Sequence, residues 1–371
     1  MVDRRRIVRL WDAGGAQALV TLIRVEGSSY RRPGAHLLIG AAGECAGMIS
    51  GGCLEAEVVR RALWMVRAGA VVERYSTLFD DTAELPFGLG CGGVVDLLLE
   101  PADTPECRAL MAAMEASLCG NESRVATWLP VSGSPLRRAV IAADGDVVFR
   151  SEGLDATELG VVADHFTATV DCDSEVYVET LSAPLRLFVL GAGEDAKPVV
   201  TMASLLGWNV TVADGRAQLA RQERFAGAER VLAIASVAEM EITAKDAVVV
   251  MTHSYEQDRA FLAEALASDA GYIGLLGAMH RSSLLIGEAA AQLGRSVEEA
   301  CARVWAPVGM DLGGDGAEAI ALAVMAEVQA WRQGKLGVSR RLTAEEVARQ
   351  IEQGGASRTL QTQCAMGTVE R

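Results

Sequence analysis

The sequence lacks an apolar run long enough to cross a membrane, because no stretch approaches about eighteen consecutive apolar residues. The first residues, MVDRRRIVRLWDAGG, begin basic, but Asp12 interrupts them before a signal-like apolar run forms. Positive charge is also scarce, with 34 Lys and Arg against 49 Asp and Glu and a formal net charge of −15. We therefore expect a cytoplasmic protein without a nucleic-acid surface, since phosphate binding needs clustered Lys and Arg.

Several signatures of catalysis are missing as well. The sequence contains no GxSxG, no HExxH and no P-loop, which argues against the common hydrolases, zinc proteases and P-loop enzymes. None of its eight cysteines forms a CxxC pair, which argues against structural zinc and iron–sulfur clusters. What remains is a chain of 371 residues, long enough for two or three domains with cores of their own.

The N-terminal half has the pattern of a small α+β domain. QALVTLIRV (17–25) and VVDLLLEP (94–101) are apolar runs typical of buried strands. LEAEVVRRALWMVRAG (54–69) has apolar residues at helical spacing and a terminal glycine that predicts the helix end. Residues 152–183 give no decided pattern. We place the end of this domain near Pro184, and assign residues 1–183 to it.

From residue 184 the pattern changes to alternating strands and helices. The segment 185–214 is strand, Gly-rich turn, helix, glycine and strand, and further strand patterns follow at ERVLAI and DAVVVMTH. Such alternation predicts a doubly wound parallel sheet, which is a Rossmann-like domain over residues 184–334. Residues 335–371 predict one short helix and a loose C-terminal tail.

A nucleotide-binding signature lies at the start of this second domain. Gly191, Gly193 and Ala196 form G-x-G-x-x-A between an apolar strand and a helix, which is the context the motif requires. Asp214 ends the next strand, where it would accept hydrogen bonds from a ribose diol and repel a 2′-phosphate. With Arg216 beside it, this pattern predicts NAD or an adenine nucleotide without the extra phosphate. A Rossmann-like scaffold with an empty site is the alternative.

Two other features of this domain bear on ligand binding. Glu194 and Asp195 follow Gly193 directly, so their side chains must point away if a dinucleotide phosphate binds there. His253 follows a predicted strand and faces the usual ligand crevice of such a sheet. It could act as an acid, as a base or as a hydrogen-bond donor to a phosphate. A role in fixing the loop is equally compatible with the sequence.

Two cysteines in the N-terminal half are surrounded by glycine. Cys53 follows Gly51 and Gly52 at a predicted helix start, where unpaired N–H groups stabilise a thiolate and the nearby Glu55 opposes this. Cys91 lies among glycines that leave room for a large ligand. The glycines that follow Cys91 are Gly92 and Gly93, and the loop residues that could bind an anion are Ser28, Ser29, Arg31 and Arg32. We expect these residues, together with Gly51, Gly52 and Glu55, to form a cofactor-binding site.

These residues together resemble the xanthine dehydrogenase accessory factor family, XdhC/CoxI. The resemblance covers roughly residues 15–330 and rests on blocks such as VEGSSYRRPGAHLLIG, GMISGGCLEAEV, GLGCGGVVDLLLEP, LFVLGAG and VVVMTHSYEQD. It implies a non-catalytic chaperone that holds molybdenum cofactor, supports its sulfuration and inserts it into a xanthine, aldehyde or carbon monoxide dehydrogenase. It also implies that Cys53 and Cys91 face the cofactor and that Thr252 and His253 match a family motif.

The resemblance implies cofactors and partners too. The cofactor would be molybdopterin, with a dinucleotide form open because Glu194 stands where the family commonly has histidine. The partners would be an apo molybdenum hydroxylase and a cysteine desulfurase as sulfur donor, with the chain itself a homodimer. Two other functions stay open on the residues alone. One is an NAD-dependent oxidoreductase, and the other is a sulfurtransferase that carries a persulfide on Cys53 or Cys91.

Overall fold

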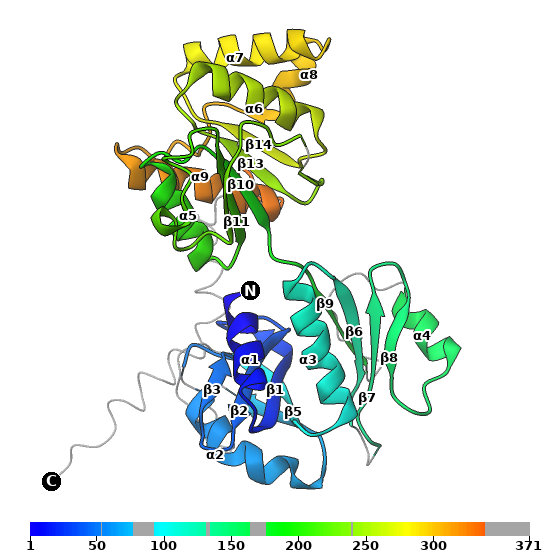
Figure 1. Cartoon of the computed structure of the whole chain (residues 1–371). Helices are drawn as coiled ribbons and strands as arrows, with labels where there is room; N and C mark the ends of the chain where they lie inside the picture. Colours follow the sequence, from blue (N-terminus) through cyan, green and yellow to red (C-terminus); the bar gives the residue numbers. More distant parts are fainter. Residues whose placement is uncertain (53, 77–92, 131–133, 164–175, 239, 338–371) are drawn as a thin grey trace, which may run out of the picture.

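The computed structural model describes residues 1–52, 54–76, 93–130, 134–163, 176–238 and 240–337. Three sheets follow one another along the chain, two antiparallel and one parallel (Figure 1). The predicted class is confirmed, because an N-terminal α+β part precedes a doubly wound parallel sheet. Within the described residues, no helix combines the length and apolar character that a membrane crossing needs.

The first sheet has five antiparallel strands in the order β3-β2-β1-β5-β4. The strands are β1 (Ala16–Gly27), β2 (Ala35–Gly40), β3 (Cys45–Gly47), β4 (Val71–Ser76) and β5 (Gly93–Pro101). Helix α2 (Glu55–Met65), which runs into the 3-10 turn η1 (Val66–Ala68), covers one face by burying Val58 and Ala62 against Val20 and Leu22. The glycine predicted to end this helical segment, Gly69, has φ +121, a conformation that other residues rarely adopt.

The second sheet has four antiparallel strands in the order β8-β7-β6-β9. The elements of this part are β6 (Ser123–Trp128), β7 (Arg137–Ala142), β8 (Val147–Arg150), α4 (Ala156–Ala163) and β9 (Val176–Leu181). Helix α3 (Pro105–Leu118) lies between the two sheets, where Leu110 and Met114 pack in one core with Leu19 and Val125 (Figure 1). It begins where the Thr104 side chain accepts a hydrogen bond from a backbone N–H of its first turn.

The third sheet is parallel, with the strand order β12-β11-β10-β13-β14-β15. Its elements are β10 (Arg186–Leu190), α5 (Ala196–Leu205), β11 (Asn209–Asp214), η2 (Gln222–Arg224), β12 (Arg230–Ala233), β13 (Ala247–Val250), α6 (Tyr255–Ala267), β14 (Tyr272–Leu275), α7 (Met279–Gln292), α8 (Val297–Cys301), β15 (Val304–Trp305) and α9 (Ala317–Arg332). In chain order this is the 3-2-1-4-5-6 arrangement of dinucleotide-binding folds, whose switch point lies between β10 and β13.

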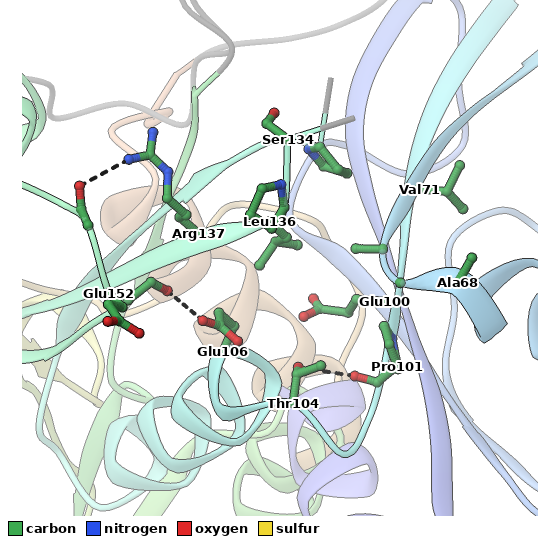
Figure 2. Close-up of a pocket in the computed structure, with 16 residues that line it drawn as sticks. Ala68, Val71, Glu100, Pro101, Thr104, Glu106, Ser134, Leu136, Arg137 and Glu152 are labelled. Carbon is green, nitrogen blue, oxygen red and sulfur yellow. Dashed lines mark hydrogen bonds between the residues drawn. The ribbon is translucent and has the colours of Figure 1, made fainter. Parts of the chain in front are cut away.

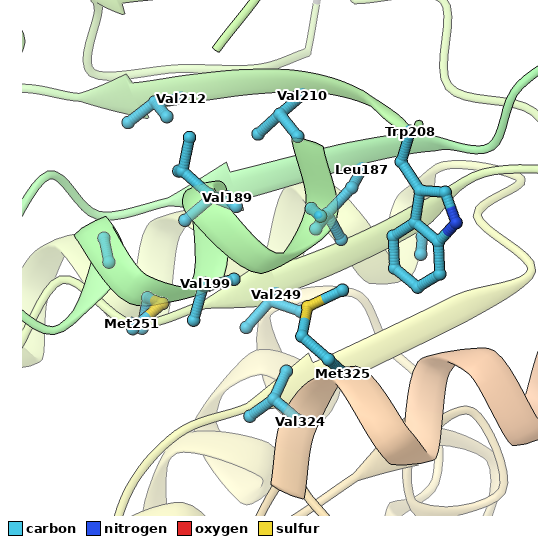
Figure 3. Packing of buried hydrophobic residues seen from close by; sticks show 14 of the residues in the cluster. Leu187, Val189, Val199, Trp208, Val210, Val212, Val249, Met251, Val324 and Met325 are labelled. Atoms are coloured by element: carbon cyan, nitrogen blue, oxygen red, sulfur yellow. The ribbon is translucent and has the colours of Figure 1, made fainter. Parts of the chain in front are cut away.

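Helices cover both faces of the parallel sheet. Helices α5 and α9 enclose one core, in which Val199 and Val324 meet Leu187, Val189 and Val249 (Figure 3). Helices α6 and α7 enclose the other core. Because both faces are buried, the strands are nearly continuous runs of Val and Leu rather than alternating sequences. This rigid sheet fixes the loops at its carboxyl edge.

A short connection joins the N-terminal part to the parallel sheet, between Leu181 and Arg186. Charged side chains from both sides hold its backbone. Arg4 of α1 (Val2–Asp12) donates to the Ser182 carbonyl at 2.8 Å, and Arg332 of α9 donates to the Ala183 carbonyl at 3.1 Å. Glu122 accepts the Ala183 N–H at 3.1 Å. A cavity of about 680 Å³ lies at this junction.

The amino end of the chain also packs on the parallel sheet's side. A Cβ placed on Gly207 would lie 2.8 Å from the Cβ of Met1, so the two segments are in direct contact. Arg5 donates a hydrogen bond to the side chain of Asn209 at the start of β11. Helix α1 therefore touches both halves of the molecule, and burial is the main cause that lowers the pKa of the Met1 amino group.

Candidate functional site

The predicted site residues fall in two regions that the fold keeps separate. The first, here the N-terminal loop cluster, consists of residues 28–32 and 49–52 and Gly93. The second, here the Rossmann edge, consists of residues 191–195, 214–216 and 252–253, at the carboxyl ends of β10, β11 and β13. Cys53, Cys91 and Gly92 lie outside the described residues, so their predicted roles stay predictions.

Gly93 joins two parts of the N-terminal loop cluster. It pairs with Gly27 at the end of the β1–β5 ladder. A Cβ at Gly93 would lie 2.2 Å from the Ser28 carbonyl oxygen and 2.8 Å from that of Glu26, so only glycine fits. The predicted glycine and serine are therefore in contact through their backbones. The loop after β1 is held against the start of β5.

The loop before α2 meets the same region. A Cβ on Gly51 would lie 3.5 Å from the Tyr30 ring, so Gly51 packs beside that ring. The Tyr30 side chain is 70% exposed and stands over the loop from outside. Gly52 has φ +104 and open space around it. The fold thus brings the predicted residues Ser28, Gly51 and Gly93 to one end of the first sheet.

Glu55 holds this loop through its carboxylate. One carboxylate oxygen accepts the N–H groups of Ile49 at 3.1 Å and Ser50 at 2.7 Å, and the other accepts the Ser50 hydroxyl. Burial alone would raise the pKa of Glu55, but these hydrogen bonds, the strongest from the Ser50 side chain, lower it below its usual value. These bonds give Glu55 a role in shaping the loop, and its predicted contact with a cofactor stays a prediction.

The two predicted arginines differ in availability. Arg31 donates to Asp3 of α1 at 2.7 Å, and this ion pair is only partly exposed. Arg32 is exposed, and its guanidinium has no side-chain partner among the described residues. Ser28 is exposed as well, and Ser29 is half-buried. Of the two cations, Arg32 is thus the one free to bind an anion at the N-terminal loop cluster.

At the Rossmann edge, Gly191 allows two strands to approach closely. It has φ +139, and a Cβ there would lie 2.4 Å from the Met251 carbonyl oxygen at the end of β13. At Gly193 a Cβ would lie 2.5 Å from the Asp195 carboxylate. Gly191 is therefore required by backbone packing, whereas the contact at Gly193 is with the end of the Asp195 side chain. The turn at Gly191 has the tight form that the motif predicts.

Asp214 is engaged by donors of its own chain. Its side chain is 0% exposed. One oxygen accepts from the Arg216 N–H at 2.8 Å and Nε at 2.9 Å, and the other from the Ala192 N–H and Arg216 Nη2, both at 2.8 Å. Burial alone would raise the pKa of Asp214, but these bonds lower it. A carboxylate that accepts from four donors is satisfied within the protein, and its predicted contact with a ribose diol stays a prediction.

The carboxylates after Gly193 are also engaged within the protein. Glu194 accepts from Lys197 Nζ and Arg224 Nη2, both at 2.6 Å, and these bonds lower its pKa. Asp195 lies 2.6 Å from His253 Nε2. The His253 side chain is 62% exposed. Its φ is +62, and it is the only non-glycine residue with a positive φ in the described part of the chain. Each acid is thus paired with a basic side chain, and the Asp195 carboxylate stays close to the Gly-rich turn, since a Cβ on Gly193 would lie 2.5 Å from its Oδ1.

Two residues that the sequence reasoning missed complete this edge. Asp258 of α6 is fully buried and accepts the Thr252 N–H at 2.9 Å and the Thr252 hydroxyl at 2.6 Å. Its other oxygen forms an ion pair with Arg281 of α7 at 2.8 Å. The conspicuous block VVVMTHSYEQD contains Asp258, six residues after Thr252, and was the available signal. This pair fixes the end of β13 to α6 and α7.

A further cavity of about 800 Å³ lies where the two N-terminal sheets meet (Figure 2). Small residues of 68–71 line one side, and Glu100 lies at its base. Both Glu100 oxygens accept from the fully buried Arg138 at 2.9 Å, and the Ser151 hydroxyl donates to Glu106 at 2.7 Å. This cavity is at the Pro101 end of β5, opposite the Gly93 end, and contains no predicted site residue.

The donor set also bears on metals. Within the part of the chain that the structure describes, no three His, Cys, Asp or Glu side chains gather in a way that could hold a metal ion. Neither region therefore offers a metal centre built from described residues alone.

Two family models match the chain. The model described as the XdhC Rossmann domain matches residues 187–328, and that of the XdhC and CoxI family matches residues 10–76. Among solved structures, the chain is similar to a crystal structure described as a xanthine dehydrogenase from Bacillus halodurans. The TM-score is 0.76 and the identity 25%, over 94% of this chain and 99% of that one.

Curated proteins give the same relationship. A probable xanthine dehydrogenase subunit of Bacillus subtilis (strain 168) is 26% identical over 328 residues, which covers 84% of this chain and 91% of that protein. The molybdenum cofactor insertion chaperone PaoD of Escherichia coli (strain K12) is 24% identical over 337 residues, 89% of each chain. With matching models at both ends and relatives that span nearly its whole length, the chain belongs to the XdhC and CoxI family.

Proposed function

We propose that this chain is a maturation factor that binds molybdenum cofactor, supports its sulfuration and inserts it into a molybdenum hydroxylase. The observation that carries the proposal is the similarity to a molybdenum cofactor insertion chaperone over 89% of both chains. The family membership supports the same role. The cofactor is cargo in this proposal, so the chain needs to hold and release it and needs no catalytic machinery of its own.

The N-terminal loop cluster has the properties that such cargo requires. Molybdopterin carries a phosphate and a bulky planar pterin. The exposed Arg32 offers a charge-assisted hydrogen bond to the phosphate. Gly51 and Gly52 leave the loop surface without side chains, and the exposed Tyr30 ring beside Gly51 offers a face for a planar ring. We therefore place the cofactor at this end of the first sheet.

The remaining parts of the proposal rest on the family and on residues at the Rossmann edge. Cys53 and Cys91 are proposed to face the cofactor, where either thiol could contact molybdenum or carry sulfur. The partners are proposed to be an apo xanthine, aldehyde or carbon monoxide dehydrogenase and a cysteine desulfurase. A homodimer in the cytoplasm and a nucleotide at the Gly191 turn complete the proposal.

The test is to purify the chain from a molybdenum-replete host and identify the small molecule that leaves on denaturation. We expect a phosphate-bearing pterin, detected by fluorescence after oxidation and by mass spectrometry. Arg32→Ala should reduce the retained pterin roughly tenfold, the effect of losing a charge-assisted hydrogen bond of about 1.5–3 kcal/mol. Arg150→Ala, which removes an exposed arginine of β8 in the other sheet, is the matched control.

Three results would contradict the proposal. The first is a wild-type chain that holds no pterin when its client hydroxylase is active in the same cells. The second is equal retention by Arg32→Ala and wild type, which would move the cargo away from the N-terminal loop cluster. The third is NADH oxidation with a small carbonyl substrate by the pterin-free chain, which would favour an oxidoreductase.

A further inference from the structure

At the end of β11 the acid, Asp214, is buried and the arginine, Arg216, is partly exposed, which is the reverse of what the sequence motif predicts. In dinucleotide-binding folds the residue at the end of the second strand meets the ribose, as an acid for a free 2′-hydroxyl or with an arginine for a 2′-phosphate. Here that strand is β11, and its acid, Asp214, is 0% exposed while the Arg216 side chain is 32% exposed. The group that this strand end presents to a ligand is therefore a guanidinium.

The hydrogen bonds of Arg216 leave part of its guanidinium available. Nε donates to Asp214, and the two N–H groups of Nη2 serve Asp214 and the Thr252 carbonyl, each at 2.8 Å. No acceptor among the described residues engages Nη1. Three bonds to two strand ends hold the guanidinium in place, so a ligand that binds Nη1 need not order a flexible side chain.

A second polar group lies at the same place. The buried Gln257 Oε1 has no hydrogen-bond partner among the described residues. Its amide is near Gly215, since a Cβ on that glycine would lie 3.5 Å from Gln257 Cδ and Nε2. A buried acceptor without a donor costs about 1–3 kcal/mol. A ribose hydroxyl that donates to Gln257 would remove this cost beside Arg216.

The charges named around this strand end balance, since Arg216, Arg281, Lys197 and Arg224 stand against Asp214, Asp258, Glu194 and Asp195. Two of the acids around Arg216 are paired with arginines, Asp214 with Arg216 itself and Asp258 with Arg281. Asp195 lies 2.6 Å from His253 Nε2. The side chain of Glu194 is turned to Lys197 and Arg224. No carboxylate in this set is left unpaired to repel a phosphate that approaches Arg216 Nη1.

The geometry points to Arg216 as the residue that sets nucleotide choice, with a ribose that carries a 2′-phosphate as its ligand and Gln257 as acceptor for a ribose hydroxyl. This inference rests on the nucleotide site included in the proposed function, and it reverses the preference that Asp214 suggests from sequence. The ligand class is a 2′-phosphorylated adenosine nucleotide, for which NADPH and 2′-AMP are suitable probes.

The experiment compares binding of NADPH and NADH to the full chain by fluorescence titration, with 2′-AMP, 5′-AMP and inorganic phosphate as competitors. We expect NADPH to bind roughly tenfold or more tightly than NADH, as expected for one added charge-assisted contact. Arg216→Gln keeps a hydrogen-bonding group beside Asp214 but removes the charge, and should abolish the difference. Arg221→Ala, an exposed arginine in the same loop, is the control and should preserve it.

The possible results of this experiment lead to different conclusions. Equal or tighter binding of NADH, absence of binding by either dinucleotide, or competition by phosphate as strong as by 2′-AMP would each overturn the inference. If Arg216→Gln does not fold, the wild-type ratio decides, together with Gln257→Leu, which should weaken both dinucleotides alike. Pterin content measured on the same samples keeps the tests apart. Pterin retention without NADPH preference overturns this inference alone, and preference without pterin overturns the cargo proposal alone.

Discussion

The glycines of this chain differ in the space that an added Cβ would have, and Gly93 is among those with the least. Gly93→Ala would place a Cβ 2.2 Å from the Ser28 carbonyl oxygen, so β1 and β5 must separate. We expect it to lower the free energy of unfolding by about 1–3 kcal/mol, the usual cost of overpacking. Urea unfolding measures this.

The matched control is Gly287→Ala in α7, where no atom lies within 4 Å of the added Cβ. Alanine is favoured over glycine inside a helix by about 1 kcal/mol, so this variant should be at least as stable as wild type. Equal stability of the two variants would show that the contact between Gly93 and Ser28 is not tight in solution.

At the same scale, the sequence indicated which residues carry structural constraints better than it indicated their roles. Gly191 and Gly93 are required where predicted, because a glycine signals a backbone constraint directly. Asp214 and Glu55 were expected to face a ligand but bind their own chain. A sequence shows that an acid ends a strand or begins a helix, but the same acid is free or engaged depending on donors such as Arg216, whose direction only the fold determines.

At the scale of elements, the start of α2 makes stability depend on pH. The pKa of Glu55 is lowered in the folded chain, so its contribution is complete above the usual value of 4.5 and is lost as pH falls through the lower folded pKa. Glu55→Gln should therefore cost about 1 kcal/mol at pH 7 and progressively less below pH 4.5. Urea unfolding between pH 3 and pH 7 measures the difference.

Ser50→Ala serves as the companion variant, because it removes one donor to Glu55 and should bring its pKa nearer to the usual value. The acid-dependent part of the stability should then shrink without disappearing. A cost of Glu55→Gln that stays constant from pH 7 to pH 3 would contradict the proposed hydrogen bonding.

Most predicted elements exist, and the missed ones were short or irregular in pattern. The strands at 16–27 and 93–101 and the helix at 55–65 match the predicted segments closely. Helix α1 was missed because its buried residues, Ile7 and Val8, are too few to give a helical period in so basic a segment. The expected short helix after residue 335 lies almost wholly outside the described residues.

At the scale of the whole molecule, Glu122 controls the connection between the two halves. It accepts the Ala183 N–H at 3.1 Å and also binds Lys245, which precedes β13. Glu122→Ala removes both contacts, and Glu122→Gln retains an acceptor for the N–H. We expect exchange of the Ala183 amide hydrogen to accelerate roughly tenfold in Glu122→Ala and much less in Glu122→Gln, the cost of one lost hydrogen bond of about 1.4 kcal/mol.

Global stability should change by less than about 1 kcal/mol in either variant, because the ion pair with Lys245 is largely exposed. Hydrogen exchange of residues 182–186 with a parallel urea titration makes the distinction. Identical exchange in wild type and Glu122→Ala would mean that Arg4 and Arg332 suffice to hold the connection.

The contact of Met1 with Gly207 and of Arg5 with Asn209 has a practical consequence for producing this chain. An affinity tag fused ahead of Met1 would push against the neighbouring half of the molecule and loosen the arginines on either side of the connection. Experiments on cargo and nucleotide should therefore use protein from which any tag ahead of Met1 has been removed.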